Sequence, residues 1–147
     1  MLAEGILRNL FRTGVVSSVN EKNGTVRVIF DDKDNMVSDE LPMLSFEYDM
    51  PKAKQQVLCL FLPNGIQQGF CLGAFYSQIN PPPVQNKNIY RKMFDDGTYI
   101  EYNKETKLLT VKAPGNINII GNLTVEGNIN ATGSIMDAGG NSNHHSH

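Results

Sequence analysis

The chain has 147 residues, with 13 basic and 15 acidic side chains, 40% hydrophobic residues, no tryptophan and a formal net charge of −2. This composition is too apolar for a disordered chain and too poor in charge for a coiled coil. No run approaches the roughly 18 to 20 apolar residues of a membrane span, and the N-terminal residues lack the apolar run of a signal peptide, so we expect a soluble protein made in the cytosol. Cys59 and Cys71 each lie in an apolar run and are expected to be free, buried thiols.

Charge is distributed unevenly along the chain. The last 35 residues contain no Lys or Arg, and Glu126 and Asp137 are their only acidic residues. Three consecutive prolines at 81–83 cannot continue a sheet, because proline lacks the amide donor, and they favour an extended connector. We therefore predict a first domain over residues 1–80, a Pro-rich connector over 81–92 and an elongated second domain over 93–147.

The first domain begins with apolar residues at helical spacing over 2–11, which predicts a short amphipathic helix. Residues 14–19 and 25–30 alternate around Asn23-Gly24 and read as a β-hairpin. Residues 56–62 and 67–75 form a second predicted hairpin, with Pro63-Asn64-Gly65 as its turn. Four or five strands in about 70 residues, with one long connection, are typical of a small closed or partly open barrel.

Barrels of this kind often bind oligonucleotides, but the charge of this one is unfavourable. Residues 1–80 contain 7 basic and 9 acidic side chains, whereas phosphate binding depends on Lys and Arg. Five of the acidic residues crowd the loop over 31–40, namely Asp31, Asp32, Asp34, Asp39 and Glu40. That loop lacks the glycine punctuation and terminal glutamate of a calcium loop, so we expect a solvated loop and no nucleic-acid partner.

A six-residue repeat occupies the region after residue 114. Four successive hexads each begin with glycine, and their regular apolar residues all fall at odd positions over about 25 residues, which is longer than an ordinary strand. Glycine every sixth residue allows the chain to turn a corner between short strands. The expected strand corners are Gly115, Gly121, Gly127 and Gly133, and the expected inward-facing core residues are Ile117, Ile119, Leu123, Val125, Ile129, Ala131 and Ile135.

Such hexads indicate a β-helix, and two types are possible. A single-chain left-handed β-helix uses three hexads per coil, so four hexads would make barely more than one coil, which could not bury its own apolar row. Three chains wound together would instead give several complete triangular layers. The short repeat therefore favours a homotrimeric prism, entered through a hairpin predicted over residues 93–113.

All three histidines, His144, His145 and His147, lie in the last four residues. Ser146 interrupts the run, which argues against a purification tag. Residues i and i+2 of an extended strand share a face, so His145 and His147 would point to the axis of a trimer and His144 to solvent if the alternation continues. Six imidazoles on one axis suit octahedral coordination of a first-row divalent metal and not tetrahedral zinc.

The order of these motifs resembles the baseplate assembly protein V, or tail spike, family of contractile-tailed phages. The resemblance is carried by GVV at 14–16, GTVRV at 24–28, LP at 41–42, VLCLF at 57–61, QGFCLGAFY at 68–76, PPP at 81–83 and FDDGT at 94–98, followed by the glycine hexads and the terminal His145-Ser146-His147.

This resemblance implies an all-β protein whose oligonucleotide/oligosaccharide-binding (OB) type barrel serves as a structural collar for a trimeric β-helix. It also implies one iron ion per trimer, held on the threefold axis at the apex by His145 and His147. The implied function is that of a central baseplate spike, in a phage or a phage-tail-like bacteriocin, that pierces the bacterial envelope when the sheath contracts. The implied partners are the baseplate hub, other tail proteins and, transiently, the envelope. Assembly would occur in the bacterial cytoplasm, before the spike becomes part of an extracellular particle.

Two other functions compete with this one. A hexapeptide-repeat acyltransferase-like β-helix enzyme would need many more coils and a catalytic histidine between subunits, whereas every histidine here is terminal. An OB-fold nucleic-acid-binding protein is disfavoured by the acidic excess. We therefore expect no enzyme activity, no catalytic residue and no small-molecule substrate.

Overall fold

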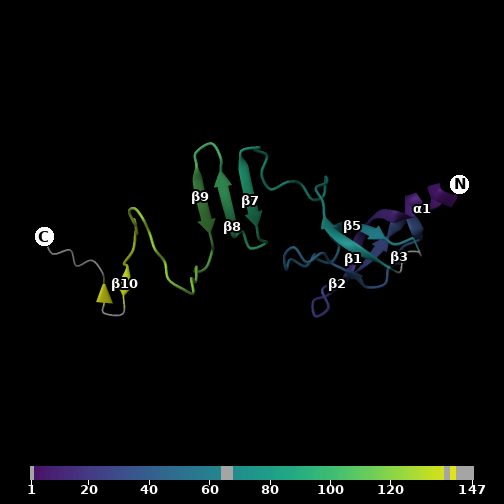
Figure 1. Ribbon diagram of the computed structural model, residues 1–147, viewed down its shortest axis with the longest axis horizontal. Coiled ribbons are helices and arrows are strands. Elements are labelled where there is room, and N and C mark those ends of the chain that lie inside the picture. Colours follow the sequence, from purple (N-terminus) through teal and green to yellow (C-terminus); the bar gives the residue numbers. More distant parts are fainter. Residues whose placement is uncertain (1, 64–67, 138–139, 142–147) are drawn as a thin grey trace. The chain divides into compact units, whose positions relative to one another are not determined.

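The computed structural model describes residues 2–63, 68–137 and 140–141. The chain divides into two compact units, Met1–Lys87 and Asn88–His147. In the described residues the fold is all-β apart from one short helix and one 3-10 turn (Figure 1).

The first unit contains a helix and a six-stranded sheet. Its elements are α1 (Leu2–Leu10), β1 (Phe11–Asn20), β2 (Thr25–Phe30), the 3-10 turn η1 (Asp31–Lys33), β3 (Met36–Val37), β4 (Leu41–Pro42), β5 (Gln56–Phe61) and β6 (Gly69–Ala74). The strand order is β3-β2-β1-β5-β6, with β4 also paired to β2, and every strand pair is antiparallel.

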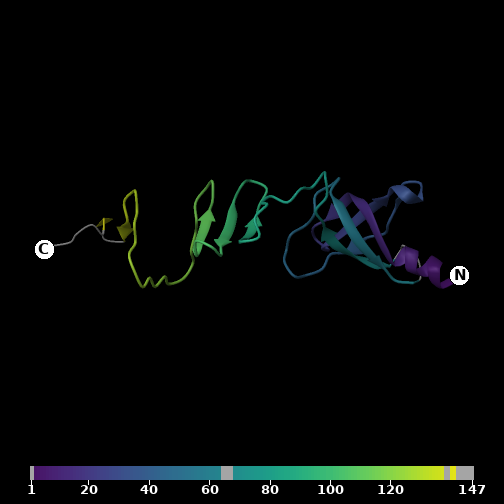
Figure 2. The ribbon, with the colours of Figure 1, turned by 90° about the horizontal axis from the view of Figure 1, so that it is seen from above.

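Backbone pairing in this unit runs in a ring. The chain leaves β4, which is paired to β2, and at once makes a parallel bridge from Met43 to Cys71 on β6. The pairings β2-β1-β5-β6 therefore lead back to β2, and the strands curl around one another in the view of Figure 2.

Alternation along β2 and β5 builds the core inside this ring. Every second residue of β5 is buried, and so are Val26, Val28 and Phe30 of β2. The rings of Phe30 and Phe61 meet edge to face with centroids 5.5 Å apart. Gly14 permits the close approach of β1, because a Cβ there would lie 2.5 Å from Val28 Cγ1 and 2.6 Å from the Ile29 carbonyl oxygen.

The two hairpins predicted in this unit are confirmed as β1-β2 and β5-β6. The helix over 2–11 is also present, although it ends at Leu10 and β1 begins at Phe11, before the expected start at residue 14. Residues 11–14 are extended because they pair with β5, from Phe11 opposite Leu60 to Gly14 opposite Val57. The predicted turn at 63–65 lies partly outside the described residues.

The second unit begins with a three-stranded antiparallel sheet. Its strands are β7 (Ile89–Met93), β8 (Tyr99–Asn103) and β9 (Leu108–Lys112), which lie side by side in both ribbon views (Figures 1 and 2). Residues 94–98 join β7 to β8, with Gly97 at a φ of +85°. Strand β7 corrects the prediction, because it begins inside the expected 81–92 connector and converts the expected hairpin into a three-stranded sheet.

Residues 113–135, which hold the first three hexads and the start of the fourth, contain no assigned strand, although the sequence predicts one strand per hexad. A strand needs a neighbouring backbone with which to pair. Two of the four predicted strand corners, Gly121 and Gly127, adopt a φ of +139°, which L-amino acids rarely adopt. Beyond them, β10 (Met136–Asp137) pairs antiparallel with β11 (Gly140–Asn141).

Candidate functional site

The predicted core row of the hexads is exposed in the single chain. Six of its residues are between 45% and 69% exposed, namely Ile117, Ile119, Leu123, Val125, Ile129 and Ile135, and the smaller Ala131 is exposed as well. Glu126 is the only charged residue over 113–136. A contiguous apolar surface without charge is unfavourable in water and marks a surface that another molecule covers.

The sheet β7-β8-β9 presents a second exposed apolar surface, which we call the apolar face. Directly paired residues share a face, so the register places Tyr90, Tyr102 and Leu109 in one row and Lys92, Ile100 and Val111 in the next. The five uncharged members of these rows are between 36% and 69% exposed. The apolar face ends in Leu109 and Val111, whose odd positions continue into the odd-numbered row of the hexads.

The opposite face of this sheet carries an ion pair beside exposed apolar residues. Arg91 donates from Nε to Glu101 Oε2 at 2.6 Å, and its guanidinium lies 4.5 Å from the ring centroid of Tyr99. The ammonium of Lys112, which is paired with Tyr99 on the neighbouring strand, lies 5.8 Å from the same centroid. Met93 and Leu108 lie on this face too and are 48% and 61% exposed, so both faces of the sheet show apolar surface.

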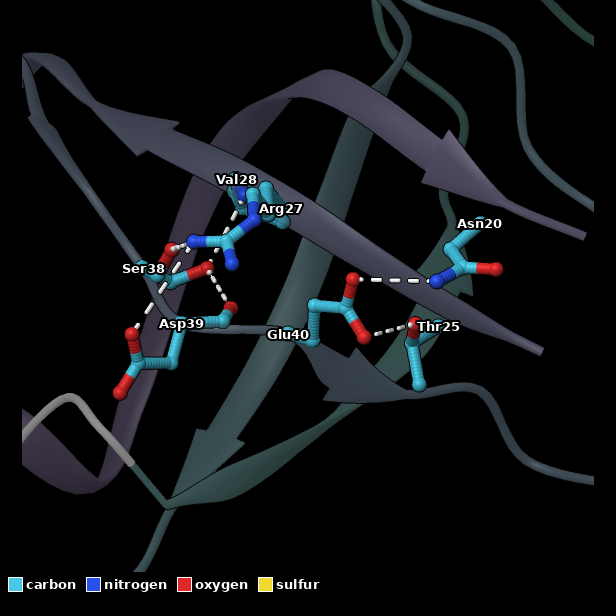
Figure 3. A network of polar contacts seen from close by, with 7 residues as sticks. All are labelled: Asn20, Thr25, Arg27, Val28, Ser38, Asp39 and Glu40. Carbon is cyan, nitrogen blue, oxygen red and sulfur yellow. Dashed lines mark hydrogen bonds and ion pairs between the residues drawn. The ribbon is translucent and has the colours of Figure 1, made fainter. Parts of the chain in front are cut away.

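The acidic loop of the first unit has a structural role that the sequence analysis missed. Glu40 accepts hydrogen bonds from Asn20 Nδ2 at 3.1 Å and Thr25 Oγ1 at 3.0 Å (Figure 3). The bond from Asn20, followed by that from Thr25, lowers the pKa of Glu40 below its ordinary value. Glu40 thus ties the loop to both strands of the first hairpin while it stays exposed to solvent, as expected for this loop.

Ser38 fastens the same loop to β2 from inside. This buried hydroxyl accepts from the Val28 amide at 3.0 Å and donates to the Asp39 carbonyl oxygen at 2.7 Å (Figure 3). Asp39 also pairs with Arg27 at 4.0 Å. Ser38 and Val28 are ten residues apart in the chain, so their hydrogen bond leaves no periodic signal in the sequence. This contact could not have been predicted from the sequence.

Arg12 is a buried cation of the first unit. Its side chain is only 3% exposed, donates from Nη2 to Asp32 Oδ1 at 2.5 Å and lies 4.8 Å from the centroid of Phe30. Its Nε and Nη1 atoms are buried and have no hydrogen-bond partner among the described residues. A cavity of about 580 Å³ adjoins it, with Asp31 and Asp32 in its wall. One cation beside two carboxylates is a poor fit for a phosphate.

The three histidines lie outside the described residues. Within the described ranges, no group of three or more His, Cys, Asp or Glu side chains could hold a metal ion. Met136 pairs antiparallel with Asn141 in the last described part of the chain. The prediction for His145 and His147 rests on their own spacing, because residues i and i+2 of an extended strand share a face.

Among the described residues, no helix has the length and apolar character needed to span a membrane.

No protein-family model matches the chain. It is 32% identical over 113 residues to the spike protein of Escherichia phage P2, an alignment that covers 73% of this chain and 52% of the relative. The chain thus spans about half the length of this curated relative. On this evidence, most of the chain is similar to a phage spike protein.

Proposed function

We propose that this protein is the central spike of a contractile tail baseplate and pierces the bacterial envelope when the sheath contracts. The observation that carries the proposal is the uncovered apolar row of the hexads, in a chain similar to a phage spike protein. Its role is mechanical and not catalytic, because the force comes from the sheath and the spike has only to resist it. The chain's partners are then the baseplate hub, other tail proteins and, briefly, the envelope.

The covering molecule for the apolar row is a second and third copy of the same chain. The repeat is too short to coil on itself, and residues 113–135 carry no assigned strand in the single chain. Three copies, each supplying one side at every level, would pair the backbone and bury all three rows on the axis. The apolar face of β7-β8-β9 runs into the same row through Leu109 and Val111, which extends the trimer contact into the sheet.

The first unit acts as the collar of the spike. The ring of backbone pairing closed by the parallel bridge from Met43 to Cys71 supports an OB-type barrel. Its carboxylates are engaged in holding its own loop, and the cavity beside Arg12 has an acidic wall. A joint to the rest of the baseplate suits this surface better than a nucleic-acid site. Titration with single-stranded DNA at low salt should therefore show no binding, and micromolar affinity with a steep salt dependence would contradict the collar role.

His145 and His147 would hold one iron ion per trimer at the tip. Three chains bring six imidazole nitrogens, a donor set that suits an octahedral first-row metal. The bound ion would join three chain ends beyond the last hexad. Because only neutral imidazole binds, metal should be released as the pH falls below the ordinary histidine pKa of about 6.5.

The solution mass of the full chain, measured by light scattering, together with its iron content tests the proposal. A trimer with about one iron per three chains is expected from the coordination of six imidazoles. A monomer without metal would contradict both the trimeric spike and the tip. A trimer without iron would contradict the tip alone.

A further inference from the structure

The two cysteines of the chain face one another across a strand pair. Cys59 lies on β5 directly opposite Cys71 on β6, and both are fully buried in the core of the first unit. Opposed residues of antiparallel strands have Cα atoms about 4.5 to 5.5 Å apart. That interval falls within the range of about 4.4 to 6.8 Å that a disulfide bond spans. The register therefore places the two residues within the ordinary reach of a disulfide bond.

The two thiols shift each other's pKa. A hydrogen bond with Cys71, and after it burial, raises the pKa of Cys59, whereas a hydrogen bond with Cys59 lowers the pKa of Cys71. The direction of these shifts favours Cys71 as the attacking thiol. The pair has an attacking sulfur and a resolving sulfur within the same contact.

We propose that Cys59 and Cys71 are a peroxide-sensitive pair that closes to an intrachain disulfide and locks β6 to β5. The Cys71 thiolate attacks one oxygen of hydrogen peroxide, the O–O bond breaks, and the hydroxide that leaves takes up the proton released by Cys71. The resulting sulfenic acid is attacked at sulfur by Cys59, whose proton leaves with the hydroxyl group as water. In total, two thiols and one peroxide give one disulfide and two waters.

Burial decides which oxidant can act. Both thiols have no exposed surface, so a bulky disulfide such as oxidised glutathione cannot reach either sulfur without opening the strand pair. Hydrogen peroxide is small and uncharged, so it needs a much smaller opening than a bulky disulfide does. The crosslink would fix the strand that completes the ring, because Cys71 also makes the backbone bridge to Met43.

The experiment treats the purified full-length protein with hydrogen peroxide, removes the excess with catalase, and alkylates free thiols with iodoacetamide in denaturant. Intact mass should show loss of both alkylated sites and a chain lighter by about 2 Da than the reduced chain. Dithiothreitol should restore both sites, and the closed form should have a higher thermal midpoint than the reduced form. Oxidised glutathione at the same oxidising equivalents should close the bond far more slowly.

Two matched variants separate the roles of the sulfurs. Cys59→Ala leaves Cys71 without a resolving partner, so peroxide should stop at sulfenic acid, trapped by dimedone, or proceed to sulfinic acid. Cys71→Ala is the matched control and should likewise form no intrachain disulfide. Should either variant fail to fold, the wild-type mass decides alone. Two thiols that both remain alkylatable after prolonged peroxide, or that are oxidised to sulfinic acid without a disulfide, would overturn the proposal.

Discussion

Replacement of Ile119 by Asp tests the trimeric prism at its centre. Ile119 is 60% exposed in the single chain and belongs to the odd-numbered row that three copies would bury. Full burial of an isoleucine contributes about 1.5 to 3 kcal/mol, so the part of Ile119 still exposed is worth about 1 to 2 kcal/mol per chain and about 3 to 5 kcal/mol per trimer.

The aspartate adds a larger cost than the lost isoleucine. Three carboxylates would meet near the axis without cationic partners, because Glu126 is the only charged side chain of the segment 113–136. Burial of an unpaired carboxylate costs several kcal/mol for each chain. The sum is about 10 kcal/mol or more per trimer, which lowers the association constant by roughly seven powers of ten at about 1.4 kcal/mol for each. Ile119→Asp should therefore be monomeric at micromolar concentration.

The neighbouring residue provides the matched control. Ile120 carries the same side chain one position along, is 94% exposed and faces away from the row. Ile120→Asp should remain trimeric by sedimentation equilibrium over a range of concentrations, and tails assembled with it should still kill cells while those with Ile119→Asp should not. A trimer that survives Ile119→Asp, or one that Ile120→Asp dissociates, would refute the assignment of odd positions to the axis.

Three further predictions follow from the barrel and the tip. Arg12→Met should leave the urea-derived free energy of unfolding unchanged or higher, because methionine keeps the packing on Phe30 and removes two buried donors without partners. Arg12→Ala should lower that free energy by about 2 to 4 kcal/mol, because it also loses the packing. Equal losses in the two variants would contradict this reasoning. The folded-state pKa of Glu40 is lowered, so the stability that its carboxylate contributes is present above the unfolded pKa and is lost as the pH falls through the folded pKa. In a plot of thermal midpoint against pH, Glu40→Gln should therefore fall less steeply than the wild type on the acid side. Parallel curves for the two proteins would refute this. His145→Ala should remove bound iron, measured by plasma emission, and His144→Ala should not, with both variants trimeric; the opposite result would place the site on the other face of the strand.

Both hairpins of the first unit could be predicted because their signals are local. Residues 25–30 and 56–61 alternate between buried and outward positions, and Asn23-Gly24 supplies the turn, with Gly24 at a φ of +65°. The start of β1 could not be predicted, since residues 11–14 are extended only because β5 lies beside them. Strand β7 was missed for the same reason, because its pairing with β8 is what converts a polar connector into a strand.

The acidic loop shows how much of the candidate chemistry depends on tertiary contacts. Charge counting alone correctly marks the loop as acidic but cannot assign its members to partners. Glu40 meets Thr25 across 15 residues, and Asp32 meets Arg12 across 20. Neither separation is one at which a regular helix or a tight hairpin brings two side chains together, so neither contact could be predicted from the sequence.

The amino-acid sequence by itself determined the period of the hexads, the residues of the apolar row and the i, i+2 pair of histidines, because each of these depends only on the two-residue repeat of an extended chain. Only the tertiary structure decided that β6 returns to meet the segment after β4, that Cys59 lies opposite Cys71, and that the acidic loop is tied to the hairpin. These contacts join residues far apart in the chain, and their formation depends on the loop-closure entropy and the burial gained when the whole unit folds.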